Sequence, residues 1–286
     1  MRMQTRISSK SKEVVIGPGE PVVMIGERIN PTGRKKLAES LEKGDMRLVQ
    51  AEALTQVAAG AQVLDVNMGA SGTDEKALMI EALAALAEIT DVPLCIDSAK
   101  PDVLAAGLEV YQGKALVNSV NGEEAKLKEV LPLVAQHKAA VVGLTMDDNG
   151  IPLDVTTRLT IAEKIVNEAA KLGIPLEDIV IDPLAMAVAS SDKAGMSALQ
   201  ALQEVRSKFG VNQTIGASNV SFGLPDRPFI NSVFLSMAMI CGLTCPITDP
   251  TVWVVREALL ISDLMLGKDE FAMNFITTYR EQHPDL

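Results

Sequence analysis

Hydrophobic residues fall into short continuous runs, and these runs alternate about eight times with longer segments whose apolar positions recur every three or four residues. The continuous runs predict buried strands, and the longer spacing predicts amphipathic helices. The expected strands cover residues 22–25, 63–67, 94–96, 115–117, 140–144, 179–181, 214–215 and a run that ends at 248. Strands that are apolar throughout favour a parallel sheet covered on both faces.

A predicted helix follows each predicted strand, and the first helix, over residues 34–59, is expected to break near Gly44. Eight such units in 286 residues favour a single (β/α)8 TIM barrel of the α/β class. An open doubly wound sheet is the alternative, but no glycine-rich phosphate loop follows the first strand. We therefore expect a barrel over residues 22–270, a loose or strand-swapped leader at 1–21 and a C-terminal tail at 271–286.

Composition and charge narrow the possible partners. The net charge of −11 argues against nucleic acid and anionic membranes, because a broadly acidic surface repels both. The longest apolar stretch, residues 233–247, is too short and too interrupted to span a bilayer. Three cysteines in apolar runs predict reduced thiols and a cytoplasmic location. With only two histidines, His137 and His283, we expect no metal site.

Carboxylate and amide side chains stand at the ends of the predicted strands, which meet at one mouth in a barrel of this kind. The residues are Glu27, Asp65, Asn67, Asp97, Asn118, Asn121, Asp182, Asn219 and Asp249. Each of them taken alone could cap a helix or form a turn, and we attribute Asp249 mainly to a turn. Their recurrence at corresponding positions favours a binding site.

The chemistry of this set narrows the ligand. It lacks cysteine, histidine and lysine, which argues against a nucleophilic thiol or serine and against a Schiff base. Paired carboxylates also suit glycoside hydrolysis, but sugar sites use aromatic platforms, and this chain has one Trp and two Tyr. A carboxylate can accept two parallel hydrogen bonds, and an asparagine can donate and accept at once. The set therefore fits a flat ring rich in N–H groups, such as a pterin.

Eight short segments occur in the order that one enzyme family shows. They are Ile25–Asn30, Leu64–Gly69, Cys95–Ser98, Asn118–Asn121, Gly143–Met146, Asp182–Pro183, Ser218–Ser221 and Asp226–Asn231. In these segments the chain resembles the pterin-binding methyltransferases, which move a methyl group between tetrahydrofolate and a corrinoid protein. The resemblance extends to methyltetrahydrofolate:corrinoid/iron–sulfur protein methyltransferases, to enzymes of corrinoid-dependent demethylation, and to the folate domain of cobalamin-dependent methionine synthase.

The resemblance implies a (β/α)8 barrel, a homodimer and specific roles for residues at the mouth. By position, Asp97, Asn118 and Asp182 would hold the pterin ring. Asn219 would lie beside the methyl-bearing nitrogen and act as the catalytic hydrogen-bond donor. The remaining residues implied to bind the pterin or folate are Asp65, Ser218, Arg227 and Glu27.

The substrate would be tetrahydrofolate or 5-methyltetrahydrofolate, and a partner protein would carry the corrinoid. Neither histidine stands in the Asp-x-His-x-x-Gly context that corrinoid-binding modules use. Two alternatives stay open. A dihydropteroate synthase has a similar barrel, although its Asn-x-Thr-Pro-Asp-Ser-Phe loop is missing here. A folate-binding subunit without chemistry of its own is the other. The direction of methyl transfer is also open.

Overall fold

A parallel eight-stranded sheet forms the centre of the molecule, as the computed structural model of residues 3–282 shows. Residues 283–286, which include His283 and the end of the expected C-terminal tail, lie outside the described residues. The strands follow the order β10-β3-β4-β5-β6-β7-β8-β9. They are β3 (Ile25–Ile29), β4 (Val63–Asn67), β5 (Leu94–Asp97), β6 (Leu116–Asn121), β7 (Ala140–Leu144), β8 (Ile179–Asp182), β9 (Asn212–Gln213) and β10 (Ile247–Thr248). The α/β class and the parallel sheet are confirmed.

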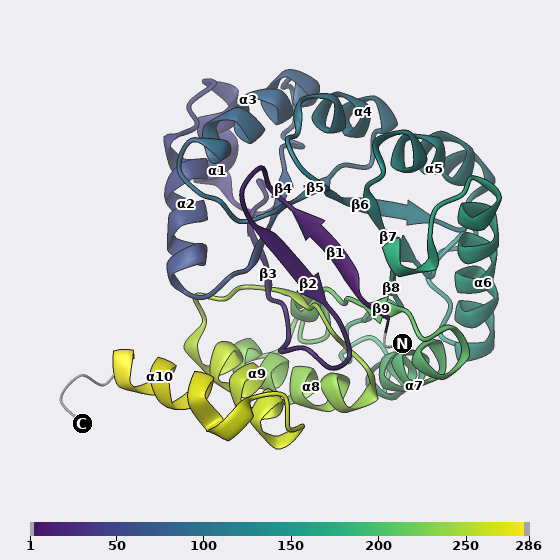
Figure 1. The fold of residues 1–286 in the computed structure, drawn as a ribbon. Coiled ribbons are helices and arrows are strands. Elements are labelled where there is room, and N and C mark those ends of the chain that lie inside the picture. Colours follow the sequence, from purple (N-terminus) through teal and green to yellow (C-terminus); the bar gives the residue numbers. More distant parts are fainter. Residues whose placement is uncertain (1–2, 283–286) are drawn as a thin grey trace.

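The helices from α1 to α9 surround the curled sheet as an outer ring, and α10 lies outside this ring against α9 (Figure 1). They are α1 (Lys35–Glu42), α2 (Arg47–Ala58), α3 (Glu75–Ala87), α4 (Pro101–Val110), α5 (Glu124–His137), α6 (Val155–Lys171), α7 (Ala194–Phe209), α8 (Arg227–Cys241), α9 (Trp253–Met265) and α10 (Met273–Gln282). Three short 3₁₀ turns are η1 (Leu176–Asp178), η2 (Ala217–Asn219) and η3 (Glu270–Ala272). The helix predicted over 34–59 is indeed broken, since Gly44 adopts a left-handed φ of +65° between α1 and α2.

Two strands at the edges of this order, β9 and β10, approach each other. Gly216, just after β9, forms an isolated parallel bridge with Ile247 of β10. The Ile247 N–H donates to the carbonyl of Ile215 over 3.0 Å. The sheet is therefore strongly curled, and the carboxyl ends of its strands face the same region.

The first parallel strand begins later than the sequence predicted. Residues 22–24 are buried but belong to no strand, and β3 instead runs from Ile25 to Ile29. Its ladder starts at Ile25 because both neighbours pair there, Val63 of β4 and Ile247 of β10. The strand consequently carries Glu27 within its length.

Residues 5–16 form an antiparallel hairpin, so this part of the expected leader is not loose, which was one of the two alternatives for residues 1–21. β1 (Thr5–Ser8) pairs with β2 (Glu13–Ile16). Ile7 and Ile16 are fully buried in a cluster with strand residues such as Ile25 and Leu116. The hairpin lies across the centre of the helical ring (Figure 1). It supplies apolar side chains to the interior of the sheet, opposite the ends that carry the polar residues.

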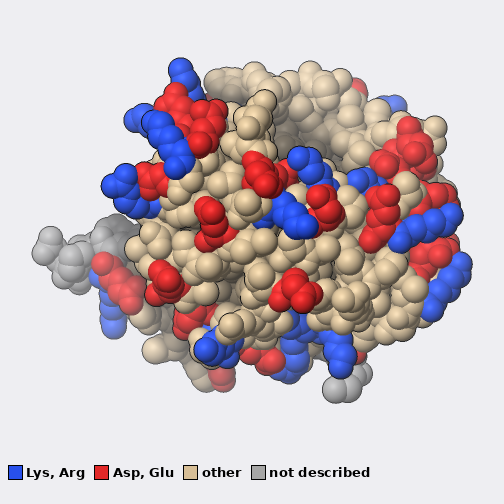
Figure 2. All heavy atoms as spheres, turned by 90° about the horizontal axis from the view of Figure 1, so that it is seen from above, with Lys and Arg blue, Asp and Glu red and all other residues tan. Residues whose placement is uncertain are grey.

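Apolar packing fixes the frame that holds those strand ends. Two further clusters fill the space between sheet and helices: one spans β4 to β8, and the other contains residues of α7, α8 and α9. On the face seen in Figure 2, acidic and basic side chains are interspersed among uncharged ones. No helix among residues 3–282 has the length and apolar character needed to cross a membrane.

Candidate active site

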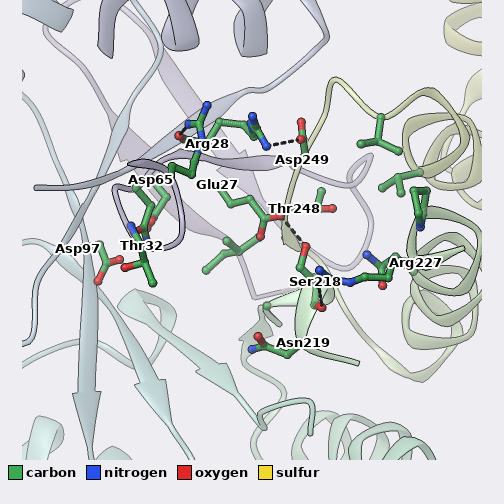
Figure 3. A pocket seen from close by; sticks show the side chains of 18 of the residues that line it. Glu27, Arg28, Thr32, Asp65, Asp97, Ser218, Asn219, Arg227, Thr248 and Asp249 are labelled. Carbon is green, nitrogen blue, oxygen red and sulfur yellow. Dashed lines mark hydrogen bonds and ion pairs between the residues drawn. The ribbon is translucent and has the colours of Figure 1, made fainter. Parts of the chain in front are cut away.

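A cavity of about 710 Å³ opens at the carboxyl ends of the strands. It is lined by residues of β3 to β6, of η2, and of the segments around β10, α8 and α9. Seven of the eight predicted site residues line it: Glu27, Asp65, Asp97, Asn118, Ser218, Asn219 and Arg227. Residues that lie up to 200 positions apart in the chain are thus brought to one site (Figure 3).

Asp65, Asp97 and Asn118 form one side of this cavity from three consecutive strands. The register pairs Asp97 with Asn67 of β4 and with Asn118 of β6. The Asn118 Nδ2 donates to Asp65 over 3.0 Å, and the Asn67 Nδ2 donates to Asp97 over 2.9 Å. Burial raises the pKa of both aspartates, and the Asp65 charge raises the pKa of Asp97 further. This side is rich in acceptors and binds a proton readily.

Asp182, the eighth predicted residue, is buried at the end of β8 and does not line the cavity. Its carboxylate accepts the Leu184 N–H over 2.7 Å, and burial raises its pKa to about 7. Arg158 of α6 holds the next loop by donating to the carbonyls of Pro183 (2.7 Å) and Leu184 (2.9 Å). Sequence reasoning missed Arg158, because its position in an amphipathic helix gives no sign that it is fully buried.

The segment that carries Asn219 is held from two sides. The Ser218 hydroxyl donates to Glu27 over 2.6 Å. Arg227, at the start of α8, donates to the Ser218 carbonyl over 2.7 Å and to the Ser221 hydroxyl over 3.2 Å. Burial raises the pKa of Glu27, a shift that the Ser218 hydrogen bond opposes. Glu27 and Arg227 therefore fix the short turn η2 that presents Asn219 at the mouth.

Charged side chains from the first βα unit form the rim. Arg28 pairs with Glu52 (3.5 Å) and with Asp249 (3.2 Å), while Arg34 pairs with Glu52 and donates to the Arg28 carbonyl. Asp249 also forms the predicted turn by accepting the Thr251 N–H over 3.0 Å. Arg28 and Arg34 line the cavity but were not among the predicted residues. The signal was present, since Arg28 lies in the segment Ile25–Asn30.

The donor set suits an organic ring better than a metal ion. Among residues 3–282 there is no group of three or more His, Cys, Asp or Glu side chains that could hold a metal. The cavity instead combines carboxylates, carboxamides, hydroxyls and arginines. Such a set can hold a flat heterocycle by its edge and an anionic group at the rim.

Comparison with known protein families identifies the family to which this chain belongs. The sequence pattern of the family described as "Pterin binding enzyme" matches residues 26–249. The chain belongs to the pterin-binding enzyme family. The match includes every strand of the sheet except the first residue of β3, and all of the cavity-lining predicted residues.

Two relatives of this pterin-binding enzyme differ in length. Methylcorrinoid:tetrahydrofolate methyltransferase of Eubacterium limosum is 30% identical over 266 residues, which cover 91% of this chain and 97% of the relative. Methionine synthase of Mycobacterium leprae (strain TN) is 34% identical over 250 residues, which cover 83% of this chain but 21% of the relative. The chain thus spans nearly the whole of the first relative and about a fifth of the second.

Solved structures of dihydropteroate synthases share the fold of this pterin-binding enzyme. The enzyme of Xanthomonas albilineans, in complex with indole-2-carboxylic acid and 6-chloroguanine, has a TM-score of 0.69 at 21% identity, over 92% of this chain and 98% of that chain. The Yersinia pestis enzyme with a pterine-sulfa conjugate has a TM-score of 0.69 at 18% identity, over 92% and 100%. These similarities show that the fold is shared.

Proposed function

We propose that this enzyme transfers a methyl group between N5 of tetrahydrofolate and the cobalt of a corrinoid that a partner protein carries. The observation that carries the proposal is the relative from Eubacterium limosum, a methylcorrinoid:tetrahydrofolate methyltransferase aligned over 97% of its length. The acceptor-rich cavity supports it, because a pterin ring offers the matching N–H donors.

The pterin ring would lie against Asp65, Asp97 and Asn118. A carboxylate there accepts the ring N–H and the exocyclic amine together, and Asn118 both donates and accepts. Asp182 would complete the set from the end of β8, which β7 separates from β6 and where its carboxyl group is buried. Leaving such ligand donors unpaired costs about 1–3 kcal/mol each, so this pairing selects the ring.

Asn219 would act on the leaving group. A methyl group on a tertiary amine is hard to displace because the departing nitrogen carries negative charge. A proton taken up at N5 from solvent makes the leaving group neutral, and a hydrogen-bond donor that tightens only in the transition state stabilises the charge that develops on this nitrogen. Asn219 is exposed at the mouth, and no residue among 3–282 occupies its carboxamide with a hydrogen bond. The turn held by Glu27, Ser218 and Arg227 would aim it.

The partner supplies the reduced cobalt that attacks the methyl group, and this chain supplies the folate pocket and the donor. Differential stabilisation of one transition state accelerates both directions, so the proposal covers methylation of the corrinoid and its demethylation alike.

The proposal also includes the architecture. The sheet closes as a (β/α)8 barrel over residues 22–270, which the Gly216–Ile247 bridge supports, with residues 1–21 and 271–286 as additions. A homodimer is supported by an exposed apolar stripe on α8, formed by Phe229, Val233, Met237 and Ile240. The free cysteines support a cytoplasmic location.

Methyl transfer to free cob(I)alamin, followed by absorbance, tests the reaction with 5-methyltetrahydrofolate as donor. Asn219→Ala should lower turnover at saturating folate by about 100-fold or more, while folate affinity changes little. Asn167→Ala, an exposed asparagine of α6, is the matched control. Unchanged turnover in Asn219→Ala would remove the role of Asn219. Folate binding without transfer would favour a binding subunit, and condensation of pterin pyrophosphate with p-aminobenzoate would favour a dihydropteroate synthase.

A further inference from the structure

Arg158 is a fully buried cation whose hydrogen bonds go to backbone carbonyls. It lies in the first turn of α6, and its exposed fraction is 0%. Its Nε donates to the carbonyl of Pro152 over 2.6 Å, and its Nη1 donates to the carbonyls of Pro183 (2.7 Å) and Leu184 (2.9 Å). Its Nη2 has no hydrogen-bond partner among residues 3–282. An arginine stays charged inside a protein, so this buried charge needs a countercharge nearby.

Two acidic residues supply negative charge to Arg158. Burial lowers the pKa of Arg158, and the charges of Asp182 and Asp154 oppose this shift. Asp154 is the exposed N-cap of α6, where its carboxylate accepts the N–H groups of Thr156 and Thr157. Asp182 is buried at the end of β8. The buried countercharge of Arg158 is therefore the Asp182 carboxylate.

One peptide group connects Arg158 with Asp182. The Pro183 carbonyl, which accepts the Arg158 Nη1, belongs to the same peptide group as the N–H of Leu184. That N–H donates to the Asp182 carboxylate over 2.7 Å. Hydrogen bonds in a chain polarise one another, so a guanidinium at the carbonyl makes the N–H at the other end a stronger donor. The charge of Arg158 thus acts on Asp182 through this peptide group as well as through space.

The backbone at this peptide group is held in an unusual conformation. Leu184 has a left-handed φ of +65°, which is unfavourable for a residue with a Cβ. In this conformation the Leu184 N–H reaches Asp182, while the Leu184 carbonyl reaches Arg158 together with that of Pro183. Backbone strain persists only where surrounding contacts fix it. Here the two carbonyls bound by one cation and the N–H bound by one carboxylate are those contacts.

We propose that Arg158 is a positioning residue for Asp182, which it holds in the ionised form that accepts the N–H groups of the pterin ring. The inference rests on the proposed function, which gives Asp182 its contact with the ring. An ionised carboxylate accepts hydrogen bonds with both oxygens, whereas a protonated carboxyl group must also place an O–H of its own. Burial favours the protonated form, and Arg158 opposes this preference.

The groups around Asp182 leave this role to Arg158. Burial raises the pKa of Asp182 to about 7, a shift that the Leu184 N–H, the Arg158 charge and the Gly216 N–H oppose. The other titratable group that faces Asp182 among residues 3–282 is the thiol of Cys245. Burial raises the pKa of that thiol to about 12, so it carries no charge near neutral pH. Arg158 is thus the cation that acts on Asp182.

Carbon-13 NMR of labelled aspartate carboxyl groups measures the effect without any ligand. The Asp182 signal, identified by its loss in Asp182→Asn, should titrate in the wild type with a pKa of about 7. Arg158→Gln keeps a donor for the Pro183 carbonyl but has no charge, so the pKa of Asp182 should rise by about one pH unit. Arg158→Lys keeps the charge and should stay closer to the wild type. Arg206→Gln, which removes an exposed guanidinium of α7, should match the wild type.

Folate affinity at two pH values tests whether this effect reaches the ligand. At pH 6, Arg158→Gln should bind 5-methyltetrahydrofolate about tenfold more weakly than the wild type, and Arg158→Lys should recover most of the loss. At pH 9 the affinities should agree within about twofold, because Asp182 is then ionised in both proteins. Glu27, Asp65 and Asp97 are present in every variant, so their titration cancels in the ratio of affinities.

Several outcomes would overturn the assignment. An unchanged Asp182 titration in Arg158→Gln is one, and an affinity loss of equal size at pH 6 and pH 9 is another, because Arg158 would then act on loop geometry alone. If circular dichroism finds Arg158→Gln unfolded at pH 8, it should be folded at pH 5, where Asp182 is protonated; unfolding at both pH values would also overturn it. A wild type that does not bind 5-methyltetrahydrofolate, with the Asp182 titration shifted as expected, would instead refute the proposed function.

Discussion

Asp182 makes the stability of the free protein depend on pH in a way that can be measured. Its carboxyl group is buried at the end of β8, and burial raises its pKa from 3.8 to about 7. A pKa that is higher in the folded state means that the folded protein holds the proton more tightly than the unfolded chain. The resulting stability is fully present below about pH 4 and is lost as the pH rises through about 7.

The size of this effect follows from the two pKa values. The difference between 3.8 and about 7 corresponds to roughly 4 kcal/mol in total, at about 1.4 kcal/mol per pH unit. Between pH 5 and pH 8, the part lost is about 2–3 kcal/mol. Asp182→Asn keeps an oxygen that can accept the Leu184 N–H but cannot ionise. The free energy of unfolding of this variant should therefore not fall by that amount between pH 5 and pH 8.

Urea unfolding at pH 5 and pH 8, followed by circular dichroism, measures the difference. The free energy of unfolding of the wild type should fall by about 2–3 kcal/mol more than that of Asp182→Asn. Asp192→Asn makes the same change at an exposed loop position and should follow the wild type. Glu27, Asp65 and Asp97 titrate in both proteins, so their contributions cancel in the comparison. Parallel pH profiles, within about 0.5 kcal/mol, would refute the reasoning.

Two further substitutions test the packing of the N-terminal hairpin and the positioning of Asn219. Ile7→Ala should lower the free energy of unfolding by about 2–5 kcal/mol, because Ile7 is fully buried under the strands; Arg6→Ala, on the exposed face, should change it by less than about 1 kcal/mol. Gly216→Ala should lower turnover about tenfold with little loss of stability, because the new Cβ would lie 3.2 Å from the Asn219 Nδ2. Gly195→Ala, with room for a Cβ, should leave turnover unchanged.

The parallel sheet and the convergence of polar strand ends were predictable, since both follow from short-range patterns. Continuous apolar runs identified the strands, and the parallel arrangement places all their carboxyl ends on one side. That is why Asp65, Asp97 and Asn118, from three separate runs, could be expected together. The hairpin at residues 5–16 was missed although buried positions alternate with exposed or half-buried ones in both strands. Four-residue strands give too short an alternation, and only the packing against the sheet makes them fold.

The residues that were missed are those whose role depends on burial or on distant partners. Arg158 lies in an amphipathic helix, where a polar residue is ordinarily on the solvent side. Only the packed structure shows that the Arg158 guanidinium reaches the carbonyls after Asp182. The limits of β3 were misjudged for a related reason. A strand begins where its neighbours begin, and the apolar run at 22–24 extends beyond the ladder.

The acidic side of the cavity lacks a cationic partner among the described residues, and the proposed pterin ring would supply the missing hydrogen-bond donors. Asp65 and Asp97 are hydrogen-bonded to the carboxamides of Asn118 and Asn67, and no arginine or lysine is paired with either among residues 3–282. Without a cation, burial keeps their pKa raised and the charged form unfavourable. A ligand that brings several fixed N–H donors supplies the missing stabilisation, whereas a ring without them leaves buried charge unpaired. Under the proposed function, selectivity for a pterin edge would come from this lack of a cationic partner, and a lysine in place of Asn118 that paired with Asp65 would remove it.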